Sequence, residues 1–328
     1  MFLEATLVIS LLILLWLVLT YRGWKKRLLK SLGNGSQIAN TSIGEIEYSM
    51  KGNGPVLLML HGSPGGYDQS LLDFERWTKE GFSLLAISRS GYLRTPLSSG
   101  RTFQQQADAI IALLDELNIS KVSVLAASGG GPTALHLAKR YPDRIRALVL
   151  MAAVCKQYTV KEEQKNSILA RIILSDSIAD IGVWFYDVLT RYWTSRSLRE
   201  MFKENTLLES DELDLLVKEV MSNAEQVDWY KRFIRTTCPM SLRIPGLKND
   251  LFHLEKVSFD NLENVTCPAL VIHGTADGDV SFDNAEFSSS SIPNSRLYKL
   301  ENIGHILWLG NHVEDMYSEI SKFLKDVE

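Results

Sequence analysis

Hydrophobic residues along this chain follow three patterns, and the first is an uninterrupted apolar run near the N-terminus. Residues Ala5–Leu19 carry no charge, and only Thr6 and Ser10 are mildly polar. Extended to Phe2 and Tyr21, the run reaches roughly 20 residues, or about 30 Å as a helix, which matches the hydrocarbon core of a bilayer. The pattern therefore predicts one transmembrane helix.

The flanks of this run indicate an uncleaved anchor and its orientation. A cleaved signal peptide needs positive charge before the run and small residues after it, whereas Glu4 precedes it and aromatic and basic residues follow it. Since basic flanks stay in the cytoplasm, residues 1–30 are expected to form a single-pass anchor with the bulk of the chain on the cytoplasmic side. Four Asn-x-Ser/Thr triplets do not outweigh this charge asymmetry. The basic residues of the flank are Arg22, Lys25, Lys26, Arg27 and Lys30.

The next segment predicts a flexible linker. Residues 31–42 read SLGNGSQIANTS, which is rich in Gly, Ser and Asn and poor in large apolar residues. The folded domain is therefore expected to begin near Ile43, and removal of residues 1–30 is expected to release it as a soluble protein.

The second pattern is an alternation of short apolar runs with helical periodicity. Continuous apolar runs of this kind are typical of parallel strands that are buried on both faces. The alternation predicts an α/β fold, with a mostly parallel sheet and helices on both of its faces. The expected strands are Glu45–Met50, Val56–Leu60, Phe82–Ile87, Val122–Ala126, Ala147–Met151, Ala269–Ile272 and Arg296–Leu300, and the expected helices are Gln69–Lys79, Phe103–Leu117, Gly131–Arg140 and Val313–Leu324.

The third pattern is a long helical stretch in which the alternation stops. It covers residues 153–266 and contains aromatic residues such as Trp184, Phe185 and Trp229. This predicts an inserted helical cap that divides the core into residues 43–152 and 267–328. The cap aromatics either line a pocket or form the cap's own core.

Charge and cysteine content exclude some functions. Thirty-five Lys and Arg against 39 Asp and Glu give a net charge of −4, so no excess of positive charge is present to bind nucleic acid. Cys155, Cys238 and Cys267 lie far apart without a CxxC pair, so neither a disulfide framework nor a zinc site is indicated.

The candidate chemistry lies where the predicted strands end. After strand Val122–Ala126 the chain reads Ala127-Ser128-Gly129-Gly130, and a helical pattern follows at once. A serine at such a tight strand-to-helix turn is held exposed above the sheet, provided that its neighbours are small. Three further elements follow other strands: the loop His61-Gly-Ser63-Pro, Asp277 and His305. The order Ser, Asp, His is the one that accompanies a nucleophile elbow.

On these motifs, residues 43–328 resemble the α/β-hydrolase superfamily, in the cap-bearing branch of esterases, lipases and proline iminopeptidases. The resemblance implies Ser128 as nucleophile, His305 as general base, Asp277 as its orienting acid, and the backbone N–H groups of Ser63 and Gly129 as the oxyanion hole. Two positions depart from the usual pattern. Ala126 stands where the elbow commonly has Gly, and Ser88 stands where an Asp is common.

Other residues compete for these roles. Asp279 is an alternative acid, although the spacing after the strand favours Asp277. His61 and His273 are each more typical of structural histidines that hold a loop. The segment after Met151 has no carboxylate, which removes the family's second position for the acid.

The implied reaction proceeds through an acyl-enzyme that water hydrolyses, and it needs no metal or organic cofactor. We expect a membrane-anchored serine hydrolase, a carboxylesterase or lipase, that acts on small-molecule or lipid esters with apolar acyl groups. Two alternatives stay open: an aminopeptidase similar to proline iminopeptidase, suggested by Pro64-Gly-Gly66, and a small-molecule receptor or scaffold without catalysis.

Overall fold

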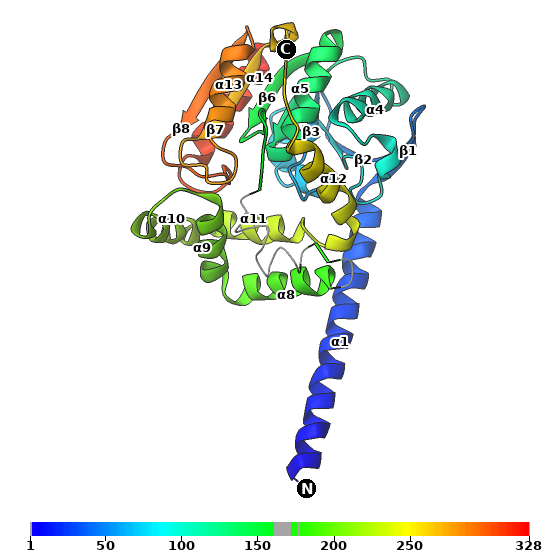
Figure 1. The fold of residues 1–328 in the computed structure, drawn as a ribbon, viewed down its shortest axis with the longest axis vertical. Coiled ribbons are helices and arrows are strands. Elements are labelled where there is room, and N and C mark those ends of the chain that lie inside the picture. The colour runs from blue at the N-terminus through cyan, green and yellow to red at the C-terminus, as the bar shows by residue number, and fades with distance from the viewer. Residues whose placement is uncertain (1, 161–171, 173, 176–177, 328) are drawn as a thin grey trace.

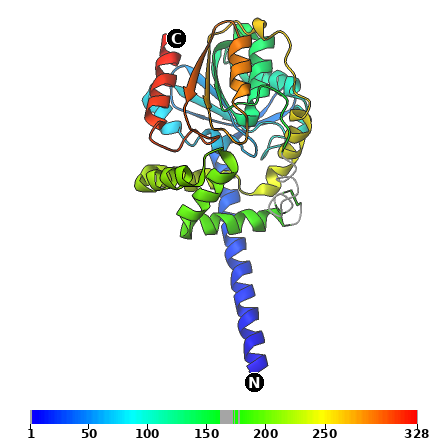
Figure 2. The same cartoon turned by 60° about the vertical axis from the view of Figure 1, so that its left-hand side comes forward.

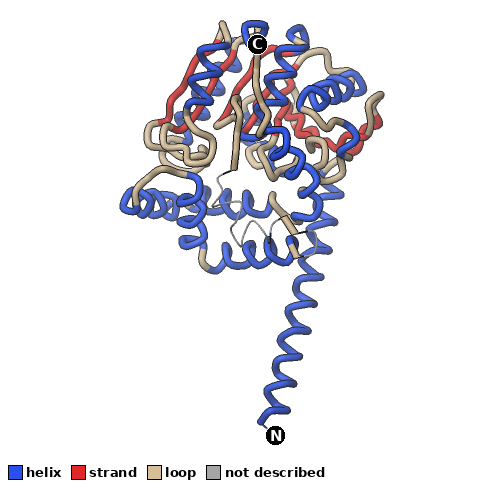
Figure 3. The backbone as a smooth tube through the Cα atoms, viewed as in Figure 1, coloured by secondary structure: helices blue, strands red, loops and turns tan. Residues whose placement is uncertain are grey.

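The core of the protein is one twisted sheet with helices on both sides (Figures 1 and 3). The computed structural model describes residues 2–160, 172, 174–175 and 178–327. In this part of the chain eight strands lie in the order β1-β2-β4-β3-β5-β6-β7-β8, parallel from β4 onward and antiparallel for β1 and β2. The strands are β1 Gln37–Asn40, β2 Glu45–Lys51, β3 Val56–Leu60, β4 Ser83–Ile87, β5 Val122–Ala127, β6 Ile145–Met151, β7 Ala269–Gly274 and β8 Ser295–Leu300.

Helices cover the two faces of the sheet unequally. Helices α4, α5 and α13 pack on one face around a cluster that includes Leu58, Val124 and Leu148. Helices α3 and α14 pack on the other face around Trp77 and Ile320. The helices of the core are α2 Tyr67–Ser70, α3 Phe74–Lys79, α4 Phe103–Glu116, α5 Gly131–Arg140, α13 Asp283–Ser291 and α14 Val313–Asp326.

The α/β alternation and the seven predicted strands are confirmed, with two differences among the helices. The single helix expected over Gln69–Lys79 is divided into α2 and α3. Helix α13 was not predicted, because its Ser-rich sequence between Asp283 and Ser291 lacks an apolar periodicity. Its side chains Ala285 and Ser288 are nevertheless buried, so packing on the sheet forms this helix.

The expected cap is helical and lies against the carboxyl ends of the strands (Figure 2). Residues 161–171, 173, 176 and 177 of the predicted cap lie outside the described residues. Helices α9, α10 and α11 share an apolar cluster with Ile306 and Leu309 of the core. The cap helices are α8 Ala179–Tyr192, α9 Thr194–Asn205, α10 Ser210–Ser222, α11 Ala224–Arg235 and α12 Ile244–Leu254.

The N-terminal helix extends beyond the predicted anchor, and the predicted flexible linker is wrong. Helix α1 runs from Phe2 to Gly35, and residues 37–40 form strand β1, which pairs with β2. Glycine and serine did not break the helix because Leu28 and Leu32 are buried there, and the Tyr67 hydroxyl donates to the Leu32 carbonyl at 2.7 Å. Residues 31–42 therefore belong to the folded domain.

The first half of α1 is exposed from Glu4 to Leu19. It projects from the domain, with its N-terminus far from the sheet (Figure 1). Among the described helices, it is the one that is long and apolar enough to cross a membrane, and the most apolar part of it is not buried in the protein. The second half packs on the cap, where Trp24 donates to Asp187 Oδ2 at 3.0 Å and Lys25 bonds Asp180 Oδ2 at 2.7 Å.

This division of α1 changes the expected result of truncation. Deleting residues 2–19 removes only the exposed apolar segment, so thermal unfolding of the remaining chain should stay close to that of the full-length protein. Deleting residues 2–35 also removes Trp24, Leu28 and Leu32 from an apolar cluster. It leaves Asp180 without Lys25 and Asp187 without Trp24. Each buried apolar side chain contributes about 1.5–3 kcal/mol, so the longer deletion should lower stability by at least about 4 kcal/mol. Circular dichroism melts of the two truncations check this, and equal melting temperatures would contradict it.

Candidate active site

The turn after β5 has the conformation of a nucleophile elbow. Ser128 has φ of 47°, in the left-handed region that non-glycine residues rarely adopt. It begins a short 3₁₀ turn, Ser128–Gly130, which continues directly into α5. A Cβ on Gly130 would lie 2.8 Å from the Leu60 carbonyl oxygen, so only glycine fits. Ala126, which departs from the usual pattern, is accommodated inside β5 and pairs with Leu60 of β3.

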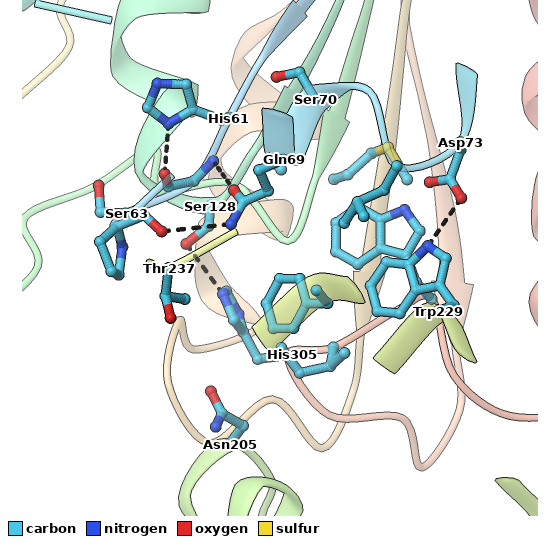
Figure 4. A pocket seen from close by; sticks show the side chains of 18 of the residues that line it. His61, Ser63, Gln69, Ser70, Asp73, Ser128, Asn205, Trp229, Thr237 and His305 are labelled. Carbon is cyan, nitrogen blue, oxygen red and sulfur yellow. Dashed lines mark hydrogen bonds between the residues drawn. The ribbon is translucent and has the colours of Figure 1, made fainter. Parts of the chain in front are cut away.

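The structure brings together the three side chains that the sequence indicated. Ser128 Oγ lies 3.0 Å from His305 Nε2 (Figure 4). His305 Nδ1 lies 2.8 Å from Asp277 Oδ2. Each comes from a loop at the carboxyl end of β5, β7 or β8. In this arrangement Nδ1–H donates to the carboxylate, and Nε2 is left to accept the serine proton.

Asp277 is held by more than its histidine. Its Oδ1 accepts the backbone N–H groups of Asp279 at 2.9 Å and Val280 at 2.8 Å. Its Oδ2 also lies 3.1 Å from His273 Nε2. Burial on its own favours the neutral acid, but the charge of His305 and the hydrogen bonds from His273 and His305 outweigh it and lower the pKa of Asp277 to about 2. Asp277 therefore remains a carboxylate.

The same contacts set the proton affinity of His305. Burial disfavours its charged form, but the charge and hydrogen bond of Asp277, together with the charge of Asp279, raise the pKa of His305 to about 9. Asp279 Oδ2 lies 3.6 Å from Nε2, the side of the ring that faces Ser128. Of the two carboxylates, Asp277 is thus placed to orient the ring, while Asp279 adds negative charge beside Ser128.

The cap positions the histidine loop. The carbonyl of Asn205, the last residue of α9, accepts the N–H of His305 at 2.9 Å and the N–H of Gly278 at 3.2 Å. Thr206 forms an isolated β-bridge with Asp277. The cap therefore contacts the backbone of both His305 and the acid loop, a contact for which the cap sequence gave no signal.

His61 and His273 occupy structural positions. His61 Nδ1 donates to the Gly62 carbonyl at 2.7 Å, and its Nε2 accepts the N–H of Arg89 at 3.0 Å. Burial and the Arg89 charge lower the pKa of His61 well below its usual value, so the ring is neutral. His273 donates to the Val280 carbonyl at 2.8 Å. Both rings hold loops, as their sequence positions indicated.

The loop after β3 lies directly against the elbow. A Cβ on Gly129 would come within 2.5 Å of Ser63 Oγ, and one on Gly62 would lie 3.1 Å from Ser128 Cβ. The backbone amides of Ser63 and Gly129 are therefore close neighbours of Ser128. Their role as an oxyanion hole stays a prediction.

A buried ion pair fixes this loop from behind. The side chains of Arg89 and Asp250 are both fully buried and form a bidentate pair, with Nη2–Oδ2 at 2.6 Å and Nη1–Oδ1 at 3.0 Å. Asp250 also accepts the hydroxyl of Tyr92 at 2.6 Å and that of Ser63 at 2.5 Å. Arg89 Nε donates to the His61 carbonyl at 3.1 Å. The pair thus joins helix α12 of the cap to both ends of the His61–Ser63 segment.

Sequence reasoning missed this ion pair. Arg89 falls in the Ser-Arg-Ser-Gly-Tyr turn after β4, which was interpreted as structural only. Asp250 lies 161 residues further along the chain, within the predicted cap, and no local pattern connects it with Arg89. The available signal was the position of Arg89, a charged residue directly after a buried strand and at the level of the active-site loops.

Ser128 and His305 open onto a cavity of about 590 Å³ between the core and the cap. Most of its wall is apolar, and on its far side Asp73 accepts the indole N–H of Trp229 at 2.9 Å (Figure 4). Burial raises the pKa of the Asp73 carboxyl. Four carboxyl groups but no Lys or Arg occur among the described residues of the lining. The apolar lining includes Met59, Trp77, Leu125, Met201, Phe233 and Trp308.

The fold and site define an α/β protein with a serine, a histidine and an aspartate aligned at the carboxyl edge of its sheet. The model of the α/β hydrolase fold family matches residues 55–311, so the chain belongs to this family and is a hydrolase of its fold. An uncharacterised hydrolase of Bacillus subtilis, YcgS, is 26% identical over 283 residues, covering 86% of this chain and 95% of the relative.

Two further relatives span most of the chain. A 2-hydroxy-6-oxononadienedioate/2-hydroxy-6-oxononatrienedioate hydrolase of Burkholderia vietnamiensis is 23% identical, covering 85% of this chain and 91% of its own. Among solved structures, an α/β hydrolase fold protein from Nakamurella multipartita is 28% identical with a TM-score of 0.80, covering 88% of this chain and 98% of its own.

The raised pKa of His305 predicts an alkaline pH profile. A protonated His305 cannot accept the serine proton, so kcat/KM should rise with pH through a midpoint above 6.5, the usual histidine value. Asp279→Asn removes one of the charges that raise this pKa, so the midpoint should move to lower pH with the maximal rate largely kept. Asp277→Asn should instead reduce the rate about 10⁴-fold, as in a serine protease triad. Rate profiles on a short nitrophenyl ester check this, and a comparable loss of rate in Asp279→Asn would show that the acid is misassigned.

The buried ion pair predicts a large stability effect. Asp250→Asn leaves the Arg89 guanidinium buried without a countercharge, which should lower the free energy of unfolding by about 3–5 kcal/mol. The matched control is Asp228→Asn, because Asp228 forms an exposed pair with Arg232 at 2.8 Å. That change should cost at most about 0.5 kcal/mol. Denaturant unfolding of both variants measures the two losses in the free energy of unfolding. Equal losses would contradict a structural role for the pair of Arg89 and Asp250.

Proposed function

We propose that this protein is a serine hydrolase that cleaves carboxylic esters of apolar acyl groups, anchored to a membrane by α1. The observation that carries the proposal is the continuous alignment of Ser128, His305 and Asp277 at 3.0 and 2.8 Å beside an apolar cavity. A neutral ester fits this cavity better than an anion, because four carboxyl groups but no described Lys or Arg line it. This charge pattern argues against the dicarboxylate substrate that the name of the Burkholderia relative gives.

The proposed reaction uses the chain's own groups in sequence. His305 Nε2 takes the proton of Ser128 Oγ as the oxygen attacks the ester carbonyl, and Asp277 stabilises the imidazolium that forms. The N–H groups of Ser63 and Gly129 receive the oxyanion. His305 then protonates the leaving alcohol, and water activated by the same ring releases the acid from Ser128.

The membrane part of the proposal rests on the first half of α1. Its apolar segment is long enough to span a bilayer and is not covered by the domain. Exposed basic residues follow it, namely Arg22, Lys26, Arg27 and Lys30, and under the positive-inside rule they support a cytoplasmic orientation of the domain.

Two carboxylates favour a second candidate, the aminopeptidase alternative. Glu200 and Glu204 of α9 are exposed residues of the cavity lining, where they could bind the free amine of an aminoacyl substrate. This activity would use the same Ser128 and His305.

Covalent labelling tests the proposed nucleophile. A fluorophosphonate should label the protein at Ser128, and Ser128→Ala should abolish both labelling and ester hydrolysis while leaving the fold intact. Labelling that persists in Ser128→Ala at another serine would contradict the assignment. The absence of labelling and hydrolysis in the wild-type chain would favour the receptor or scaffold alternative.

Rates on matched substrates distinguish the two enzymatic candidates. Nitrophenyl esters of increasing acyl length should be cleaved faster than aminoacyl amides, since the cavity is apolar. Preference for aminoacyl amides, lost in Glu200→Gln with Glu204→Gln, would select the aminopeptidase. The matched control is Ser70→Ala, which removes a hydroxyl rather than a carboxylate from the same lining.

A further inference from the structure

Helix α8 of the cap exposes an apolar face to its surroundings. Ile181 is 48% exposed, Phe185 56% and Tyr192 78%, and Ile178, just before the helix, is 47% exposed. Their spacing of three, four and seven residues places them along one stripe of the helix. Trp193, which directly follows the end of the helix, is 61% exposed.

The opposite face of α8 is the polar one. Asp180, Asp187 and Thr190 are buried there, beside Ala179 and Val183. A surface helix of a soluble domain has the reverse arrangement, with apolar residues inward and charged residues outward. The inverted pattern is typical of a helix whose outer surroundings are less polar than water.

The buried acids attach α8 to the membrane-proximal part of α1. Asp180 pairs with Lys25, Asp187 accepts from Trp24, and the rings of Tyr21 and Trp184 contact edge to face at 5.6 Å between centroids. At 1.5 Å per residue, Trp24 lies only about 8 Å along the helix beyond Leu19, the end of the apolar run. These contacts therefore hold α8 at the depth of the bilayer interface.

The orientation of α8 agrees with this depth. Figures 1 and 2 both show α8 running across α1, while the N-terminal half of α1 projects past α8 on the side away from the sheet. If α1 stands across a bilayer, α8 lies along its surface. Exposed basic residues of the α1 flank, such as Lys26 and Arg27, lie at the same level, where they can meet lipid phosphates.

We propose that the outward face of α8, formed by Ile181, Phe185, Tyr192 and Trp193, docks on the lipid bilayer. This inference rests on the proposed membrane anchor and adds a second contact to it. Amphipathic helices bind at an interface through apolar and aromatic side chains on one face, and a contiguous exposed apolar patch otherwise favours aggregation. The two contacts together fix the orientation of the domain, which a single anchor leaves free to rotate.

Docking also narrows the substrate class. Tyr186, adjacent to Phe185 on α8, lines the active-site cavity together with Met201 of α9. One side chain of the helix that docks on lipid therefore reaches the cavity. The substrate that this geometry favours is a lipophilic ester that resides in the membrane leaflet.

Spin labels on the full-length chain in phosphatidylcholine vesicles test the docking. The native cysteines Cys155, Cys238 and Cys267 are buried, so a nitroxide can be directed to Phe185→Cys. Leu12→Cys in α1 serves as the reference for lipid, and Lys121→Cys, before β5, serves as the reference for water. Collision with oxygen should be high, and collision with a water-soluble nickel chelate low, at positions 12 and 185, with the reverse at position 121.

Each other outcome overturns the inference. A lipid signal at position 12 with an aqueous signal at 185 would reject docking and leave the anchor intact, whereas aqueous signals at both would also reject the anchor. Dipolar broadening at 185, or shielding from both collision partners, would identify a second copy of the chain or another protein contact as the occupant of this face.

A kinetic comparison tests the consequence for the substrate. The double variant Phe185→Ser with Tyr192→Ser should lose several-fold in rate on an ester embedded in vesicles and keep its rate on a water-soluble short ester. Leu215→Ser, at an exposed leucine of α10, is the matched control and should affect neither rate. Equal loss on both substrates in the double variant would indicate damage to the cavity and overturn the proposal.

Discussion

The buried ion pair between Arg89 and Asp250 is the interaction on which the geometry of the site depends. Two fully buried charges are costly unless every hydrogen-bonding group around them is satisfied. Here Asp250 accepts from Arg89, Tyr92 and Ser63, and Arg89 in turn donates to the His61 carbonyl. The core and the cap must both be folded before this network closes. The loop beside Ser128 is therefore set only when the two parts are joined.

The cap repeats this principle at its other contacts. Through the Asn205 carbonyl it holds the backbone of His305, and through Asp180 and Asp187 it holds α1. Buried polar groups of the cap thus face inward, toward the loops of Asp277 and His305 and the N-terminal helix, and the outer face of α8 is left apolar. The same helical insertion therefore holds both the backbone of His305 and the position of α8 against α1.

The sequence predicted the parts of the fold that local patterns encode. Apolar runs identified the parallel strands, and the positions of Ser128, Asp277 and His305 after three of them were sufficient to bring these side chains to one edge of the sheet. Long-range polar contacts left no such pattern, so Arg89 with Asp250 was missed. The linker prediction failed for the same reason: residues 31–35 are helical because Leu28 and Leu32 pack on distant residues such as Tyr67, and composition alone does not report that packing.

Under the proposed ester hydrolysis, the charges in the cavity would act differently on the substrate and on the product. A neutral ester would pair its acyl chain with the apolar wall, so the lining carboxyl groups would impose little penalty on its binding. In the proposed reaction the product acid would form near the Asp279 carboxylate, which lies 3.6 Å from His305 Nε2, and the described lining holds no Lys or Arg to pair with it. Repulsion between the two carboxylates would weaken binding of the product. The negative charge of Asp279, which helps to raise the pKa of His305, would therefore also favour release of the acid.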